Sequence, residues 1–211
     1  MLVGSGMSMS LLIVTLVFSL PFGLVLTLLN TGRNRAARAV TGVYIMILRG
    51  TPLLLQMFFI YFGIPIFFIS VGMNPRDFTL GAFESCAIAF VLNYAAYFAE
   101  IFRGGLLAVD KGQYEAAKVL GMNKYQTFTR IIMPQMIRIS LPAVANEAII
   151  LVKDTALMTA LSVQELLFYT KSVVNKTTNI AYFAVAALFY LVMSWALSVL
   201  FKRLEKKYRM D

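Results

Sequence analysis

The sequence predicts an all-α, polytopic membrane protein with five transmembrane helices and a helical segment between the third and the fourth. Its composition is the first reason: of 211 residues, 60% are hydrophobic and only 14% are charged, and the mean hydropathy is +0.77. Soluble proteins carry nearer a quarter of charged residues. Uncharged stretches long enough to cross a bilayer are the second reason, and at about 20 residues per crossing the chain has room for roughly four to six.

The five expected spans cover residues 7–30, 51–72, 80–102, 139–160 and 177–201 of a single domain, 1–211. The first could be mistaken for a signal peptide. Its apolar run exceeds the usual length, however, no basic residue precedes it and no Ala-x-Ala follows, so we interpret it as a retained span. The fourth is the least uniform, because it contains Pro142, Glu147, Lys153 and Asp154.

The distribution of basic residues predicts the orientation. Fifteen of the 19 Lys and Arg residues fall in 33–49, 103–138 and 202–209, which lie on one side of the expected spans. The remaining four are Arg76, Lys153, Lys171 and Lys176. Because an excess of Lys and Arg marks the cytoplasmic side, the N-terminus is expected outside and the C-terminus inside.

Several classes of chemistry are excluded by composition. His is absent and Cys86 is the only cysteine, so one copy of the chain cannot build a disulfide, a zinc cluster or a Cys/His nucleophile, and we expect no metal site. No G-x-x-x-x-G-K-[ST] phosphate loop occurs, so the chain is not expected to hydrolyse ATP itself. The net charge of +9 is explained by topology and by a lipid-anchoring tail, 202–209, rather than by nucleic acid.

The segment 103–138 is too polar to span and too regular for a simple connection. Residues 112–120 have a polar start and good helix formers, and Gly121 suits a C-terminal cap. A second helix, 124–133, is expected to stop at Pro134. By pattern alone, this helical pair either lies on the lipid surface or projects as a knob into the cytoplasm.

Within this segment, Glu115-Ala116-Ala117, three residues, Gly121, nine residues and Ile131-Ile132-Met133-Pro134 resemble the EAA loop of bacterial ABC importer permeases. Met133 stands where that family usually has Leu, a swap that conserves volume. The runs 49–54 (RGTPLL) and 153–155 (KDT) resemble the polar amino acid branch of the same family. The similarity extends over about residues 7–205.

The resemblance implies a type I importer fold in which 103–138 is a coupling loop set against a cytoplasmic ATPase subunit. The residues it assigns to coupling are Glu115, Ala116, Ala117, Gly121, Ile131 and Pro134. ATP and Mg would be bound by two copies of that ATPase, with no cofactor in this chain. The implied assembly also holds a second permease subunit and an extracytoplasmic amino acid-binding protein, in a bacterial inner membrane.

Polar residues at helical spacing inside two spans are the candidate substrate contacts: Asn93, Tyr97, Glu100, Glu147 and Asp154. A charge at the centre of a membrane helix costs roughly 2.5–3.5 kcal/mol, so each calls for a reason. The excess of carboxylates favours a substrate with an ammonium or guanidinium group, and Lys153 or backbone N–H groups could bind its carboxylate. A polar amino acid of the basic, glutamine or cystine class fits this pattern, and the acidic bias favours a basic one.

Structural explanations for these residues remain open. Glu100 could form an ion pair with Arg103 three residues on, Lys153 could extend to the interface, and Asp154 could pair with a neighbouring subunit.

Two other classes of function are also open. An ion-coupled secondary amino acid carrier predicts internal repeats and broken helices, and no repeat is visible in the five unequal spans. An intramembrane enzyme would need paired catalytic carboxylates or a His/Glu metal motif, and the sequence offers neither.

Overall fold

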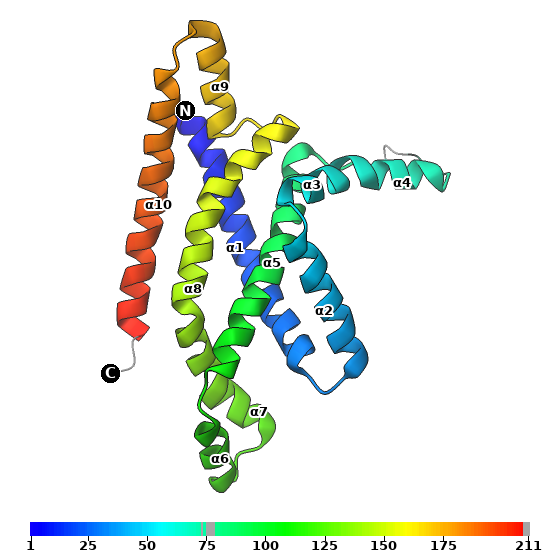
Figure 1. Ribbon diagram of the computed structural model, residues 1–211, viewed down its shortest axis with the longest axis vertical. Helices are drawn as coiled ribbons and strands as arrows, with labels where there is room; N and C mark the ends of the chain where they lie inside the picture. The colour runs from blue at the N-terminus through cyan, green and yellow to red at the C-terminus, as the bar shows by residue number, and fades with distance from the viewer. Residues whose placement is uncertain (73, 75–78, 209–211) are drawn as a thin grey trace.

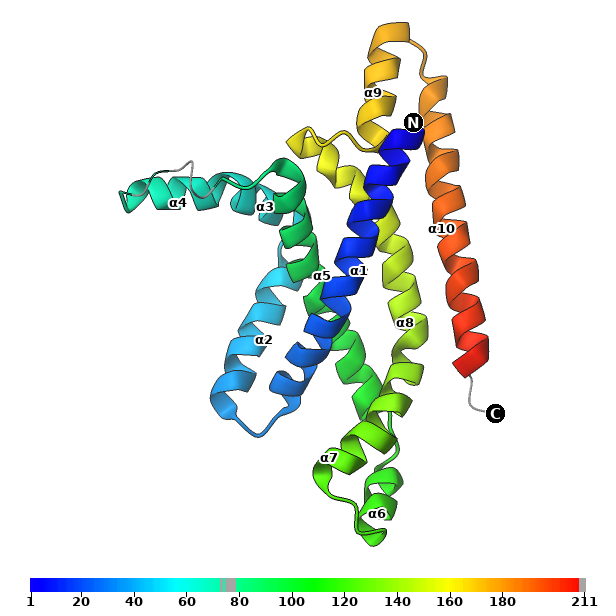
Figure 2. The ribbon, with the colours of Figure 1, turned by 180° about the vertical axis from the view of Figure 1, so that it is seen from behind.

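In the computed structural model, which describes residues 1–72, 74 and 79–208, all regular structure is helical. Four long helices, α1 (Leu2–Thr31), α5 (Ala82–Leu107), α8 (Met133–Asp154) and α10 (Ala181–Tyr208), run roughly along the long axis (Figure 1). The N-terminus lies at the end where α9 (Leu166–Thr177) meets α10, and α10 runs from there towards the other end (Figure 2). Arg76 and Arg209, which were counted in the charge distribution, lie outside the described residues.

The structure confirms five helical stretches that are long and apolar enough to cross a membrane. They are Leu2–Thr31, Leu53–Ser70, Ala82–Leu107, Lys124–Leu161 and Ala181–Lys207. The 30 residues of α1 extend about 45 Å, which exceeds the roughly 30 Å of a hydrocarbon core.

Residues 33–49, which lie between the first two expected spans, form most of a helix that we did not expect, α2 (Arg35–Gly50), packed against α1 and α5. The Asn34 side chain caps it, accepting hydrogen bonds from the backbone N–H groups of Ala36 (3.0 Å) and Ala37 (3.3 Å). The helix ends at Gly50 because Thr51 precedes a proline and is therefore extended (φ −119°, ψ 146°).

The apolar stretch after Pro52 lies across the direction of the long helices (Figures 1 and 2). It consists of α3 (Leu53–Phe58), a π-helical turn (Phe59–Gly63) and α4 (Ile64–Ser70). It is therefore α2, and not the expected second span, that returns alongside α1 in this structure.

Small residues allow the long helices to pack closely, as is common in membranes. A Cβ atom added to Gly23 of α1 would lie 2.8 Å from the Cβ atom of Phe98 and 3.0 Å from the Ala95 carbonyl oxygen of α5. The Thr27 hydroxyl donates to the Ala99 carbonyl at 2.9 Å at the same crossing. Where α5 crosses α8, the Ser140 hydroxyl occupies the place that a side chain at Gly105 would need.

The connection between α5 and α8 folds into α6 (Lys111–Val119) and α7 (Lys124–Thr127), which project at one end (Figure 1). A π-helical turn, Phe128–Ile132, joins α7 directly to α8. The prediction that Pro134 stops the helix is wrong, because Pro134 sits in the first turn of α8, where a missing N–H is tolerated.

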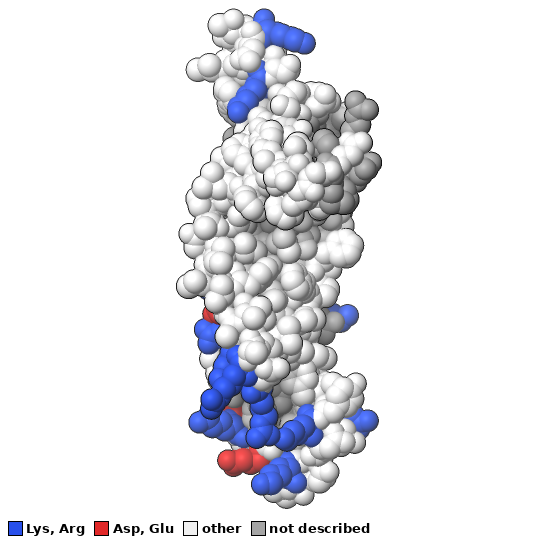
Figure 3. All heavy atoms as spheres, turned by 90° about the vertical axis from the view of Figure 1, so that its right-hand side faces the viewer, with Lys and Arg blue, Asp and Glu red and all other residues white. Residues whose placement is uncertain are grey.

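Charged side chains are concentrated at the end that carries α6 and α7. Figure 3 shows Lys and Arg gathered at the lower end of the face in view, a broad band above them almost without charge, and two basic groups at the top. A band of this kind is the surface that a hydrocarbon layer covers.

Candidate functional site

The projecting loop is built around a capped helix. The Asp110 side chain accepts a hydrogen bond from the Gly112 backbone N–H at 2.6 Å and begins α6. At its other end, Gly121 adopts φ 72°, its N–H bonds to Lys118 O (3.1 Å), and the next N–H, of Met122, bonds to Ala117 O (3.0 Å). This is a Schellman motif, which needs a residue in the left-handed region, so the structure gives Gly121 the cap expected from the sequence.

The candidate coupling residues divide between the surface and the interior. Glu115 and Ala116 are exposed, whereas Ala117 is fully buried against the rest of the loop. Ile131 and Pro134 are half-buried at the start of the following helix. The Gln135 side chain donates to Gln113 Oε1 at 3.2 Å and ties α6 to α8.

An open hollow of about 760 Å³ lies between α6 and the turn after it, lined in part by Tyr114, Lys118 and Phe128. Partial burial disfavours the ionised phenol and raises the pKa of Tyr114 above its ordinary value. The loop thus exposes the carboxylate of Glu115, the small side chain of Ala116 and an open hollow beside α6. A surface of this kind suits contact with a protein partner.

Among the candidate substrate contacts, Glu100 makes the pair that we considered as its structural explanation. Arg103 Nη2 lies 2.7 Å from Glu100 Oε2, and Arg103 Nε lies within 3.2 Å of both carboxylate oxygens. A second guanidinium reaches the same carboxylate, with Arg49 Nη1 3.9 Å from Oε2. Glu100 is therefore compensated by two cations.

Arg49 begins a line of polar and aromatic contacts that crosses from α2 to α5 and α8. Its guanidinium carbon lies 5.2 Å from the centre of the Tyr97 ring, within cation–π range. The Tyr97 and Tyr94 ring centres are 6.2 Å apart. The Tyr94 hydroxyl donates to Asp154 Oδ2 at 2.8 Å.

Glu147 of α8 is a further acidic residue near these contacts. It is half-buried and lies within electrostatic reach of both Asp154 and Arg49. Lys153, by contrast, is exposed. We name the set Arg49, Tyr94, Tyr97, Glu100, Glu147 and Asp154 the polar face.

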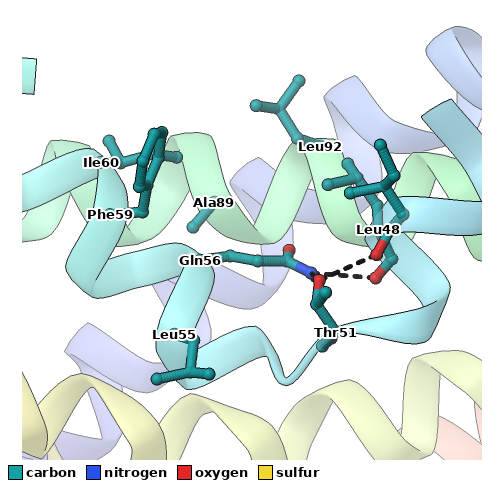
Figure 4. A pocket seen from close by; sticks show the side chains of 9 residues that line it. Leu48, Thr51, Leu55, Gln56, Phe59, Ile60, Ala89 and Leu92 are labelled. Carbon is teal, nitrogen blue, oxygen red and sulfur yellow. Dashed lines mark hydrogen bonds between the residues drawn. The ribbon is translucent and has the colours of Figure 1, made fainter. Parts of the chain in front are cut away.

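Asn93 is engaged elsewhere. It is 4% exposed, and its Nδ2 donates to Leu48 O at 2.8 Å and to Gln56 Oε1 at 3.0 Å. Gln56 in turn donates to Leu48 O (2.9 Å) and to the Thr51 hydroxyl (2.8 Å), as Figure 4 shows. These bonds fix the bend between α2 and α3, and through it the position of Arg49.

A mainly apolar pocket of about 500 Å³ opens beside this bend (Figure 4). Its lining includes Leu48, Leu55, Phe59 and Leu92, and its polar groups, on Thr51 and Gln56, are already bonded to each other. The pocket therefore suits a hydrocarbon chain better than a zwitterion.

Two members of the polar face and one further buried acid were not predicted from the sequence. Arg49 stood in the run used for the resemblance but was counted as a cytoplasmic charge, and Tyr94 was passed over in favour of Tyr97 one helical turn away. Glu165 is 0% exposed and caps α9, a helix that we did not expect. In the described part of the chain, no group of three or more His, Cys, Asp and Glu residues could hold a metal ion.

Comparison with known proteins agrees with this fold. The family described as "Binding-protein-dependent transport system inner membrane component" matches residues 7–210. The putative glutamine transport system permease protein GlnP of Rickettsia conorii is 34% identical over 97% of this chain and 90% of its own length. The arginine ABC transporter permease protein ArtQ of Escherichia coli K12 is 33% identical over 95% of this chain and 91% of its own.

A solved structure described as an amino acid ABC transporter with histidines superposes with a TM-score of 0.85. It shares 31% sequence identity and covers 98% of this chain and 92% of its own.

The fold and the site define a multi-pass membrane protein of the ABC importer permease type. The chain belongs to the family of binding-protein-dependent transport system inner membrane components. The predicted resemblance and the permease function are thereby confirmed, and the carrier and intramembrane enzyme alternatives are set aside. As a family member, the chain is the transmembrane component and not the ATPase, and it works with an ATPase and a binding protein.

Proposed function

We propose that this chain forms the amino acid path of an ATP-driven importer in a bacterial inner membrane. Two copies, or this chain and a similar second permease, would enclose the path. Two cytoplasmic ATPase subunits would bind ATP and Mg, and an extracytoplasmic protein would deliver the amino acid. The projecting α6–α7 loop, with Glu115 and Ala116 exposed, supports contact with the ATPase.

The polar face is the observation that carries the proposal. Two guanidiniums already compensate Glu100, whereas in the described part of the chain Glu147 and Asp154, the other acidic groups of the polar face, form no ion pair within 4 Å. They can accept hydrogen bonds from the ammonium group of an amino acid. Arg49, held between Tyr97 and Glu100, can bind its carboxylate.

The remaining acidic charge favours a basic side chain, with glutamine and cystine as the other members of the class. Relatives named for glutamine and for arginine support this range. Four of our candidate contacts lie on the polar face: Tyr97, Glu100, Glu147 and Asp154. Asn93 does not, but its hydrogen bonds hold the bend between α2 and α3 next to Arg49.

Uptake into proteoliposomes tests the proposal. The vesicles would hold this chain with its ATPase, ATP inside, and the binding protein with labelled arginine, glutamine or cystine outside. We expect uptake that requires ATP and that disappears in Glu115→Arg, whose reversed charge faces the ATPase. The exposed carboxylate of Glu84, at the other end of α5, offers a control in Glu84→Gln. Uptake driven by an ion gradient without ATP would contradict the proposal.

A further inference from the structure

A buried carboxylate lies at the end of the molecule opposite the α6–α7 loop. Glu165 is 0% exposed and follows the 3-10 helix Thr155–Leu161. Its side chain caps α9, accepting hydrogen bonds from the backbone N–H groups of Leu167 (2.8 Å) and Phe168 (2.7 Å). It lies outside the polar face and outside the coupling loop.

Three hydroxyl groups from three other elements donate to the same carboxylate. Thr159 donates from the 3-10 helix, Tyr190 from α10 at 2.9 Å, and Ser8 from α1 at 3.5 Å. The backbones also meet here, since a Cβ atom on Gly4 would lie 2.8 Å from backbone atoms of Glu165. One side chain thus joins α1, the 3-10 helix, α9 and α10.

This arrangement is costly to disturb. Hydrogen bonds to an ionised acceptor are about twice as strong as neutral ones. A buried carboxylate that loses its donors pays for its desolvation without compensation. The carboxylate therefore holds the four elements in one relative position.

The 3-10 helix connects this carboxylate to the polar face. It begins at Thr155, the residue after Asp154. Thr159 lies five residues after Asp154, which is about 10 Å along the helix axis at about 2 Å per residue. On its other side, Asp154 is held by the Tyr94 hydroxyl. The backbone that carries Asp154 is thus anchored by Glu165 through a short and regular segment.

We propose that Glu165 is a positioning residue for substrate binding, which keeps the 3-10 helix, and with it the Asp154 carboxylate, where the substrate ammonium group arrives. Glu165 acts on the substrate only through Asp154. The inference rests on the proposed function, because it assumes that the amino acid meets Asp154.

A double-mutant cycle tests this inference. Glu165→Gln keeps the shape but turns one acceptor into a donor that faces other donors. Binding of labelled arginine, glutamine and cystine would be measured on the purified complex of this chain with its ATPase in lipid nanodiscs. For the amino acid that the wild-type complex takes up, we expect Asp154→Asn and Glu165→Gln each to weaken binding about tenfold, the loss of one hydrogen bond to a charged group.

The double variant should bind as weakly as Asp154→Asn and no weaker, since both changes act on one contact. Additive losses would mean that Glu165 acts independently of Asp154 and would overturn the inference. Glu84→Gln, an exposed acid on α5, is the matched control and should bind as the wild type does.

Tyr190→Phe is the second variant in case Glu165→Gln does not assemble. It removes one donor and keeps the ring in place, and we expect binding to weaken a few-fold, again without further effect in the Asp154→Asn background. If Asp154→Asn weakens binding while Glu165→Gln and Tyr190→Phe bind as the wild type does, the positioning role falls and the proposed function stands. If the wild type neither binds nor imports any of the three amino acids, both fall.

Discussion

The hydroxyl of Tyr94 donates to Oδ2 of Asp154 at 2.8 Å and joins the middle of α5 to the last residue of α8. Tyr94 is 2% exposed, so little water is at hand to replace its hydroxyl. The pair links α5, which leads into the α6–α7 loop, with α8, which follows that loop.

Tyr94→Phe should weaken amino acid binding by about tenfold, because hydrogen bonds to charged groups contribute about 1.5–3 kcal/mol. Equilibrium binding to the reconstituted complex measures this. Tyr182→Phe, which removes a hydroxyl from α10 outside the polar face, should have no such effect. Equal affinities for the Tyr94 variant and the wild type would contradict the proposed contact between Asp154 and the substrate.

The two arginines that share Glu100 should behave differently. Arg49→Gln removes the group assigned to the substrate carboxylate, whereas Arg103→Gln removes a partner of Glu100 on its own helix. We expect uptake to fall by more than tenfold in the first variant and by less than threefold in the second, as partly exposed i,i+3 pairs contribute about 0.2–0.5 kcal/mol. Initial uptake rates with ATP inside decide the matter, and a reversed order would reassign the carboxylate site.

Neighbouring glycines on α5 offer a matched test of helix packing. A Cβ atom on Gly105 would meet the Ser140 hydroxyl and would lie 2.9 Å from the Met136 carbonyl oxygen, whereas one on Gly104 would meet nothing within 4 Å. Gly105→Ala should destabilise the protein by about 1–3 kcal/mol through overpacking. Gly104→Ala should be neutral or stabilising in the same thermal unfolding assay in detergent. Similar melting temperatures would show that α5 and α8 are not tightly packed there.

The turn after α6 depends on a left-handed residue. Gly121→Ala should cost about 1–2 kcal/mol, because the φ of 72° is unfavourable for a side chain. Gly121→Asn should cost less, since Asn tolerates this conformation. ATP-driven uptake should fall in the order glycine, asparagine, alanine while binding in nanodiscs is unchanged. The control is Gly6→Ala, at an open position on α1. A loss of binding would show that the turn serves folding rather than coupling.

Hydropathy and motif spacing were sufficient to predict the long helices and the helical loop between α5 and α8. They failed at α2, because Arg35, Arg38 and Arg49 hide its helical character from any measure of average hydropathy. A capping signal was present in Asn34 followed by good helix formers, and it would have predicted the helix. The short α9 was missed for a different reason, since its 12 residues are too few to cross a bilayer.

The polar face could be predicted only in part. Spacing along one helix places Glu147 and Asp154 on the same side of α8, and the structure agrees. Which side chain of a second helix reaches them depends on the rotation of that helix, so Tyr94 could not be chosen over Tyr97. Burial of Glu165 depends on four separate elements that converge, and no local pattern reports such a convergence.

The position of the crossing along α8 (Met133–Asp154) has a mechanical consequence. This helix crosses α5 at Ser140, where the close contact with Gly105 can serve as a fulcrum. From Ser140, the start of α8 at Met133 lies about 10 Å in one direction and Asp154 about 21 Å in the other, at 1.5 Å per residue. A tilt of α8 about that point would therefore move Asp154 about twice as far as Met133 and in the opposite direction, so a small movement at the loop end would be enlarged at Asp154.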